Sequence, residues 1–73
     1  MTLNDVKLNQ VVRVVNVNCD DFLKQRLSDL GLINSTTISP IFVSPLGDPI
    51  AYEFRGNIIA IRNNDAKNIE VTY

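Results

Sequence analysis

Few side chains in this sequence could carry out chemistry. The chain has no histidine and a single cysteine, Cys19, so a cysteine–histidine nucleophile cannot be built within it. The adjacent carboxylates of Asp20 and Asp21 would point about 100° apart on a helix, which suits first-turn charges better than an acid–base pair. We therefore expect Cys19 to be a small residue at a helix entry, and the protein not to be an enzyme.

Metal and phosphate sites are also hard to build from this sequence. Zinc and ferrous iron favour clusters of cysteine and histidine, and no group of carboxylates has the spacing of an all-oxygen site. The loop at 45–49 has one glycine and lacks the Gly-Lys-Ser/Thr ending of a phosphate-binding loop. We predict no catalytic residue, no metal ligand and no cofactor.

Charge and composition limit the kinds of partner. Seven basic and eight acidic residues give a net charge of −1, and the basic residues are scattered, whereas nucleic-acid binding needs a concentrated positive face. No signal peptide is visible, and the longest aliphatic run, residues 58–61, is far too short to span a membrane. We expect one cytoplasmic domain over residues 1–73, without nucleic-acid binding or membrane insertion.

One short helix is predicted over residues 20–30. Leu23, Leu27 and Leu30 have the spacing of a single apolar stripe, and acidic residues occupy the first turn. Gly31 follows the last stripe residue, where a left-handed position commonly ends a helix. Phe22 lies off the stripe, one turn before Arg26. These two side chains form either an exposed amphipathic patch or, for Arg26, a weak surface pair with Asp29.

Short β-branched or alternating runs on both sides of this helix predict strands at about 10–17, 36–43, 50–55, 58–62 and 69–72. Pro40 requires an edge position or a bulge in the second strand. Gly56-Asn57 is interpreted as a two-residue hairpin turn, and residues 63–68 as one helical turn. Short connections favour antiparallel pairing, and closure into a small barrel would remove exposed edges. The fold class predicted is mainly β, with one inserted helix.

The loop at 44–49 has two interpretations. It is a rigid connector in which Asp48 bonds nearby backbone amides, or it is a fixed knob that a partner recognises. Arg62, at the end of a strand, is expected to pair with Asp65 or Asp48.

Four of these segments, in this order, resemble the FeoA family of bacterial ferrous iron transport. Residues 26–32 are similar to its RL-x-x-LG-hydrophobic segment, and residues 45–50 to its PLGDP-hydrophobic loop. Residues 56–62 resemble its G-x-x-hydrophobic-A-hydrophobic-R strand, and residues 65–71 its acidic-A-x-x-I-x-V ending. The sequence departs from the family at Asn9 and Ser35, near positions where the family usually has glycine. Asn9 tolerates a left-handed conformation more readily than Ser35.

The resemblance implies an SH3-like antiparallel β-barrel of about five strands with one inserted α-helix. It also implies a non-enzymatic accessory that acts with the FeoB membrane transporter, whose cytoplasmic part is a GTPase, in a family associated with transition metal ions. The same barrel occurs as the C-terminal domain of iron-dependent repressors.

We therefore expect an interaction module that binds the transporter by packing. The candidate contact residues are Phe22, Leu23, Arg26, Leu27, Pro45, Leu46, Gly47, Asp48 and Pro49. The residues expected to be structural are Leu30, Gly31, Gly56, Arg62 and Ala66. Two alternatives are a self-associating domain that forms a weak homo-oligomer, and a regulator of GTPase activity, through Arg26, or of iron-dependent processes.

Overall fold

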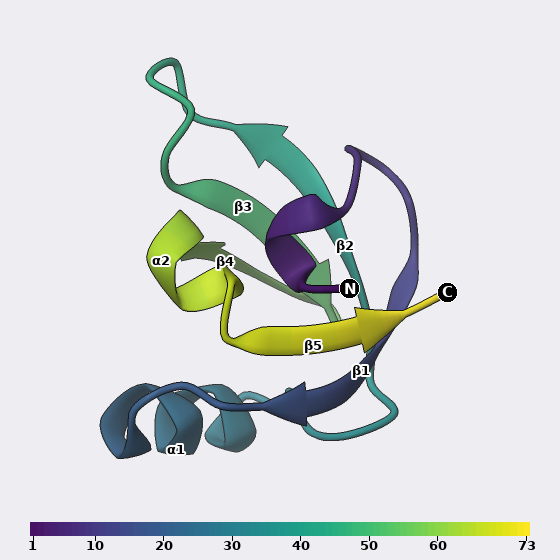
Figure 1. Ribbon diagram of the computed structural model, residues 1–73, viewed down its shortest axis with the longest axis vertical. Helices are drawn as coiled ribbons and strands as arrows, with labels where there is room; N and C mark the ends of the chain where they lie inside the picture. The colour runs from purple at the N-terminus through teal and green to yellow at the C-terminus, as the bar shows by residue number, and fades with distance from the viewer.

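The computed structural model describes residues 1–73, which form five strands and three short helical segments (Figure 1). In chain order these are η1 (Leu3–Asp5), β1 (Val12–Val17), α1 (Asp21–Asp29), β2 (Thr37–Val43), β3 (Ile50–Phe54), β4 (Asn57–Ile61), α2 (Asn63–Ala66) and β5 (Ile69–Thr72). The predicted mainly-β fold with one inserted helix is confirmed. None of the helices is long and apolar enough to cross a lipid bilayer.

The strands form one antiparallel sheet in the order β4-β3-β2-β1-β5. The sheet folds around the core, but β4 and β5 are not paired with each other, so the expected barrel is not closed by hydrogen bonds. β2 lies in the middle of the sheet, and its register shifts between Pro40 and Phe42. The proline is therefore accommodated by a bulge and not by an edge position.

The β3–β4 hairpin turns one residue earlier than the sequence suggested. Phe54 pairs with Asn57, so the two turn residues are Arg55 (φ +50°) and Gly56 (φ +78°), not Gly56 and Asn57. Two positive φ values define a type I′ turn, which fits the twist of the flanking strands. The turn prediction was wrong by one residue. Asn57 is the first residue of β4, and its side-chain amide donates to the Leu30 carbonyl.

Two residues adopt a left-handed conformation near positions where the FeoA family usually has glycine. Asn9 has φ +66° and Ser35 has φ +74°, so both turns keep a conformation that glycine adopts most readily. Near Ser35 the chain is held by the buried Thr36, whose Oγ1 donates to the Gly31 carbonyl at 3.0 Å. The same oxygen accepts from the Ile33 amide at 3.1 Å. These bonds fix the segment that leads from α1 into β2.

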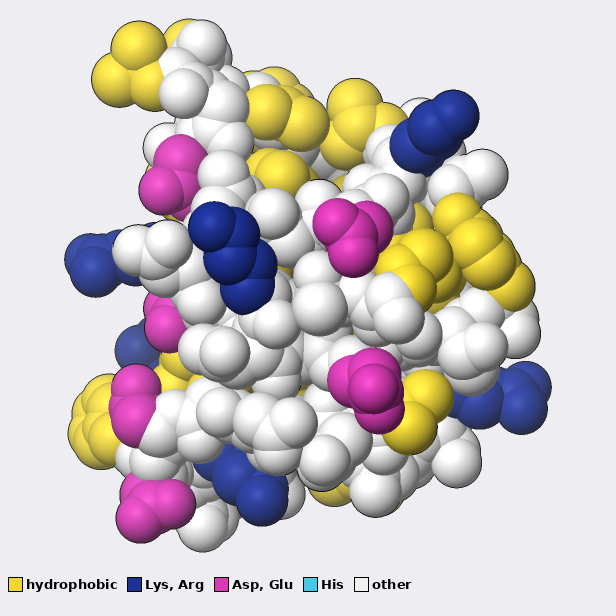
Figure 2. All heavy atoms as spheres, in the orientation of Figure 1, with side chains coloured by type: hydrophobic (Ala, Val, Ile, Leu, Met, Phe, Trp, Pro, Cys, Tyr) yellow, Lys and Arg dark blue, Asp and Glu magenta, His cyan; other side chains and the backbone are white.

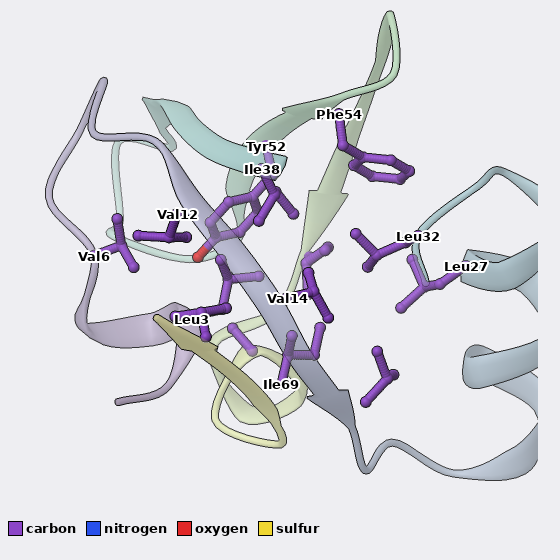
Figure 3. Close-up of a cluster of buried hydrophobic side chains, with 14 of the residues drawn as sticks. Leu3, Val6, Val12, Val14, Leu27, Leu32, Ile38, Tyr52, Phe54 and Ile69 are labelled. Carbon is purple, nitrogen blue, oxygen red and sulfur yellow. The ribbon is translucent and has the colours of Figure 1, made fainter. Parts of the chain in front are cut away.

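The core lies between the folded sheet, η1 and α1 (Figure 3). Tyr52 and Phe54 of β3 are its largest members, and Leu27 and Leu32 reach it from α1 and the segment after it. Leu3 of η1 fills the opposite side. The buried apolar side chains thus come from several different elements. Their packing holds these elements, and the loops between them, in place.

Candidate functional site

The loop between β2 and β3, residues 44–49, is closed by its own backbone. The Gly47 amide donates to the Ser44 carbonyl at 2.7 Å, and the Ser44 amide donates to the Pro49 carbonyl at 3.2 Å. Gly47 has φ +85°, a conformation that a side chain would strain. The loop is therefore a defined turn that projects from one end of the sheet (Figure 1).

The same loop is tied to the first residue of α2. Asp48 Oδ1 accepts a hydrogen bond from the Asn63 amide at 2.9 Å, and Asn63 Nδ2 donates to the Gly47 carbonyl at 3.2 Å. The residue preceding α2, Arg62, provides no side-chain cap, so the Asp48 carboxylate takes that role from another part of the chain. The amide that Asp48 binds is distant in sequence, not nearby as expected.

Arg62 does not act as predicted. Its side chain is exposed, and no ion pair joins it to Asp48 or Asp65. The carboxylate of Asp48 binds the Asn63 amide, and the Arg62 side chain lies in solvent. Ala66, by contrast, is fully buried in the core, as its expected structural role requires.

The loop presents one large apolar side chain to solvent. Leu46 is 95% exposed, and Pro45, Gly47 and Asp48 are also exposed, whereas Pro49 is half-buried. Figure 2 shows hydrophobic side chains projecting at the end of the molecule that this loop occupies in Figure 1. An immobilised loop that exposes a leucine can insert it into an apolar pocket at a low entropic cost.

Tyr52 lies buried in β3, close to the base of this loop. Burial, and to a lesser extent the nearby carboxylate of Asp48, together raise the pKa of Tyr52 to about 12. The phenol is therefore neutral at physiological pH and is not a general base. Its ring is one of the largest members of the core.

The predicted helix face divides into core and surface residues. Leu27 is 0% exposed and Leu23 is half-buried against the core, so these side chains hold α1 in place and Leu27 cannot contact a partner. Phe22 is 80% exposed, and Arg26, one turn later, is exposed as well. The contact prediction is thus corrected at Leu27, because the apolar stripe faces inward.

The start of α1 is capped as the sequence suggested. Asp20 Oδ1 accepts from the Leu23 amide at 2.9 Å, and Asp21 is the acidic residue of the first turn. The predicted pair between Arg26 and Asp29 is absent, because Asp29 accepts instead from Gln25 Nε2 at 2.9 Å. Arg26 is therefore a free cation beside Phe22.

The end of α1 is a Schellman motif. The Leu32 amide donates to the Leu27 carbonyl at 2.8 Å, the Gly31 amide donates to the Ser28 carbonyl at 2.9 Å, and Gly31 has φ +100°. Leu30 is 36% exposed, so it is less buried than the stripe predicted. Its structural role is carried by its carbonyl, which accepts from Asn57 Nδ2 at 3.0 Å.

Cys19 is a buried structural residue. Its Sγ donates to the Asp65 carbonyl at 3.6 Å. Burial raises the pKa of the thiol, and the carboxylates of Asp65 and Asp20 raise it further, which opposes formation of the nucleophilic thiolate. No group of three or more His, Cys, Asp or Glu side chains is close enough to hold a metal ion.

The two candidate contact regions do not form one surface. The β2–β3 loop lies at one end of the molecule's long axis, and α1 lies at the other (Figure 1). Sequence reasoning found both regions but could not show that they are apart, since it gave no relative positions. The sequence suggested that Asp48 bonds nearby backbone amides, but it did not identify the distant Asn63 amide as the partner.

Comparison with known proteins gives a consistent result. A family model described as the FeoA domain matches residues 1–73. The chain is 35% identical to a Campylobacter jejuni protein named as an Fe(2+) transport protein A, covering 97% of this chain and 96% of that protein. It is 27% identical to a Porphyromonas gingivalis Fe(2+) transport protein A/FeoB fusion protein, covering 97% of this chain and 8% of the fusion.

Two solved structures of similar fold belong to the same family. FeoA from Chlorobium tepidum has a TM-score of 0.94 and 32% identity, over 99% of this chain and 69% of that chain. FeoA from Stenotrophomonas maltophilia, described as a procaryotic SH3 domain protein, has a TM-score of 0.84 and 25% identity, over 97% and 88% of the two chains. The predicted SH3-like fold is confirmed.

Proposed function

The chain belongs to the FeoA domain family, and from this premise we propose that it is a non-enzymatic module that docks on the cytoplasmic face of a FeoB-type transporter. Its place in ferrous iron transport follows from the family. The docking contact is the β2–β3 loop, with Leu46 as the anchor.

The observation that carries this proposal is the combination of exposure and rigidity in one loop. Leu46 is 95% exposed, while the residues on both sides of it are held by hydrogen bonds within the loop and to Asn63. Exposed leucines on mobile loops lose entropy when they bind, whereas this one is already positioned. Phe42 and Val43 at the end of β2 are exposed as well, on opposite faces of the strand.

A FeoB-type protein is the partner that a relative supports. The Porphyromonas protein joins an Fe(2+) transport protein A and the FeoB transporter in one chain. Covalent fusion raises the effective concentration of two parts that otherwise meet by diffusion. A weak, transient contact is what a small apolar anchor would give between separate chains.

Phe22 and Arg26 form a second candidate contact region at the opposite end of the molecule. An exposed phenylalanine beside an unpaired arginine suits an apolar pocket with an acidic rim. Arg26 also has the free guanidinium that stimulation of a GTPase in trans would require. We keep this region separate from the loop, because one flat partner surface cannot touch both ends.

The test is capture of the purified transporter by tagged variants of this chain. Leu46→Ala and Phe22→Ala should each lower the amount of transporter captured, with the larger loss for Leu46→Ala. Ile33→Ala is the matched control for the loop, because Ile33 is a half-exposed aliphatic residue in the segment after α1. All variants should keep the wild-type circular dichroism spectrum, since the substituted side chains are exposed.

Full capture by both Leu46→Ala and Phe22→Ala would reject these surfaces. For the alternative through Arg26, GTP turnover by the transporter is measured with and without this chain. A stimulation that survives Arg26→Ala would eliminate an arginine-finger role.

A further inference from the structure

The outer edge of β4 has no hydrogen-bonded neighbour, whereas the opposite edge of the sheet, β5, is partly paired with the N-terminal residues. Beyond β5, the Val71 amide donates to the Met1 carbonyl at 2.8 Å, and Thr2 forms a bridge with Glu70. β4 is the other terminal strand, and its only strand partner is β3. Apart from the ladder with β3, no backbone group of residues 57–61 makes a backbone hydrogen bond.

The hairpin turn determines which backbone groups face this free edge. The type I′ turn makes Phe54 and Asn57 a hydrogen-bonded pair, and such pairs then alternate along an antiparallel ladder. The amides and carbonyls of Ile58 and Ala60 consequently point away from β3. Each of these two residues offers one donor and one acceptor to a further strand.

β4 has little of the protection usual for edge strands. Its sequence, Asn-Ile-Ile-Ala-Ile, contains no charge and no proline, and its register with β3 is regular over five residue pairs. Ile58 is 65% exposed and Ala60 is exposed too. Natural proteins usually block such an edge with a lysine, a proline or a bulge, because it otherwise pairs with another strand.

We propose that this edge pairs with the β4 edge of a second copy of the chain, antiparallel, about a two-fold axis at Ile59. In this register Ile58 faces Ala60 of the second copy, and Ala60 faces its Ile58. Both pairs consist of residues whose backbone groups point outward, so four hydrogen bonds form. An axis at Ile58 or Ala60 would leave one of these residues without a β4 partner.

Side chains favour the same register. On the outer face, Phe42 pairs across the sheet with Ala51, and Ala51 pairs with Ala60. Ile58 of the second copy would continue this row, placing two small residues between two large ones. No like charges face each other between the paired residues 58–60, because these residues carry none. The exposed Ile58 would lose contact with water on pairing.

The contact is small, and we expect a weak, reversible dimer with one continuous sheet across both copies. This inference goes beyond the proposed docking function and does not depend on it. The paired residues 58–60 belong neither to the docking loop (residues 44–49) nor to the helix patch (Phe22 and Arg26). It gives a specific geometry to the self-association that the sequence left as an alternative.

Sedimentation equilibrium of the full chain from micromolar to millimolar concentration tests the proposal. Wild type should shift from monomer to dimer within this range. Ile58→Lys, which places a charge on the edge, should remain monomeric. Val11→Lys is the matched control, because Val11 is 62% exposed and lies outside β4. It should dimerise like wild type.

A disulfide test checks the register in a Cys19→Ser background. Ile59→Cys would place two thiols opposite each other at the axis, at a separation of about 4.5 Å between Cα atoms, which suits a disulfide. Ile58→Cys is the control, because its two copies would lie diagonally apart, beyond disulfide reach. Mild oxidation should link the Ile59→Cys variant many-fold more efficiently. Thermal melts check that both variants are folded.

Three results would overturn the proposal. Wild type could stay monomeric up to millimolar concentration, which would leave the edge for a strand of another protein. Ile58→Lys could dimerise as well as wild type. Ile58→Cys could also cross-link as efficiently as Ile59→Cys, which would place the contact in a different register.

Discussion

The carboxylate of Asp48 lies 2.9 Å from the amide nitrogen of Asn63 and caps α2 across fifteen positions of sequence. The loop that holds Asp48 is also the loop that exposes Leu46. The start of α2 and the orientation of the exposed leucine are therefore fixed by the same interaction.

Asp48→Ala should lower the free energy of unfolding by about 0.5–2 kcal/mol, the usual cost of losing a helix cap. Asp48→Asn should cost less, because the amide oxygen can still accept from Asn63. Urea denaturation measures both values. Asp29→Ala, which removes an exposed carboxylate bound only to Gln25, is the control and should be nearly neutral. Equal stability of the alanine variant and wild type would contradict the capping role.

Gly31→Ala should destabilise the fold slightly more than Gly47→Ala does, because the exposed Arg55 side chain beside Gly31 must move aside at a small cost. Both glycines have positive φ, which costs an alanine roughly 1–2 kcal/mol. A Cβ at Gly31 would also lie 2.9 Å from Arg55 Cδ, whereas one at Gly47 would meet nothing within 4 Å. The difference between the two variants, measured by urea denaturation, reports the close approach of Arg55.

In an Arg55→Ala background this difference should shrink, because the side chain that meets the new Cβ is gone. A double-mutant cycle isolates the coupling between the two positions. An unchanged difference would show that backbone strain alone distinguishes Gly31 from Gly47.

Leu27→Ala should cost about 2–5 kcal/mol, as expected for a fully buried leucine. Leu30→Ala should cost only about 1 kcal/mol, because Leu30 is 36% exposed and contributes mainly through its carbonyl. Thermal or urea denaturation compares the two. Equal losses would mean that both leucines lie in the core, as the apolar stripe alone suggested.

Stability should fall at high pH because of Tyr52. The folded state raises the pKa of this phenol from 10.0 to about 12, so it holds the proton more tightly than the unfolded state does. This contribution is complete below pH 10 and is lost as the pH rises toward 12. It amounts to at most about 3 kcal/mol.

Tyr52→Phe should therefore flatten the loss of stability between pH 10 and pH 12, while filling nearly the same space in the core. Denaturation curves over this range compare it with wild type. Tyr73→Phe is the matched control, because Tyr73 is exposed and should leave the slope in place. A slope that persists in Tyr52→Phe would assign the effect to other groups.

Features set by neighbouring residues could be predicted from the sequence. The helix with its acidic start and glycine stop and the approximate positions of the strands were expected, and all are present. For Pro40 the sequence left an edge position or a bulge open, and the structure has the bulge. The scarcity of reactive groups was also clear from residue types alone. Such features follow from backbone preferences and short-range periodicity, which do not depend on how the chain folds back on itself.

Only the tertiary structure determined where distant segments meet. The hairpin turns at Arg55-Gly56, which places the Asn57 side chain against the Leu30 carbonyl and the Arg55 side chain beside Gly31. The same packing buries Leu27 and leaves Leu30 half-exposed. It also places the docking loop and the helix patch at opposite ends of the molecule, and it leaves β4 without a second neighbour. These outcomes depend on contacts between residues far apart in the chain, and no local pattern specifies which distant partner a residue finds.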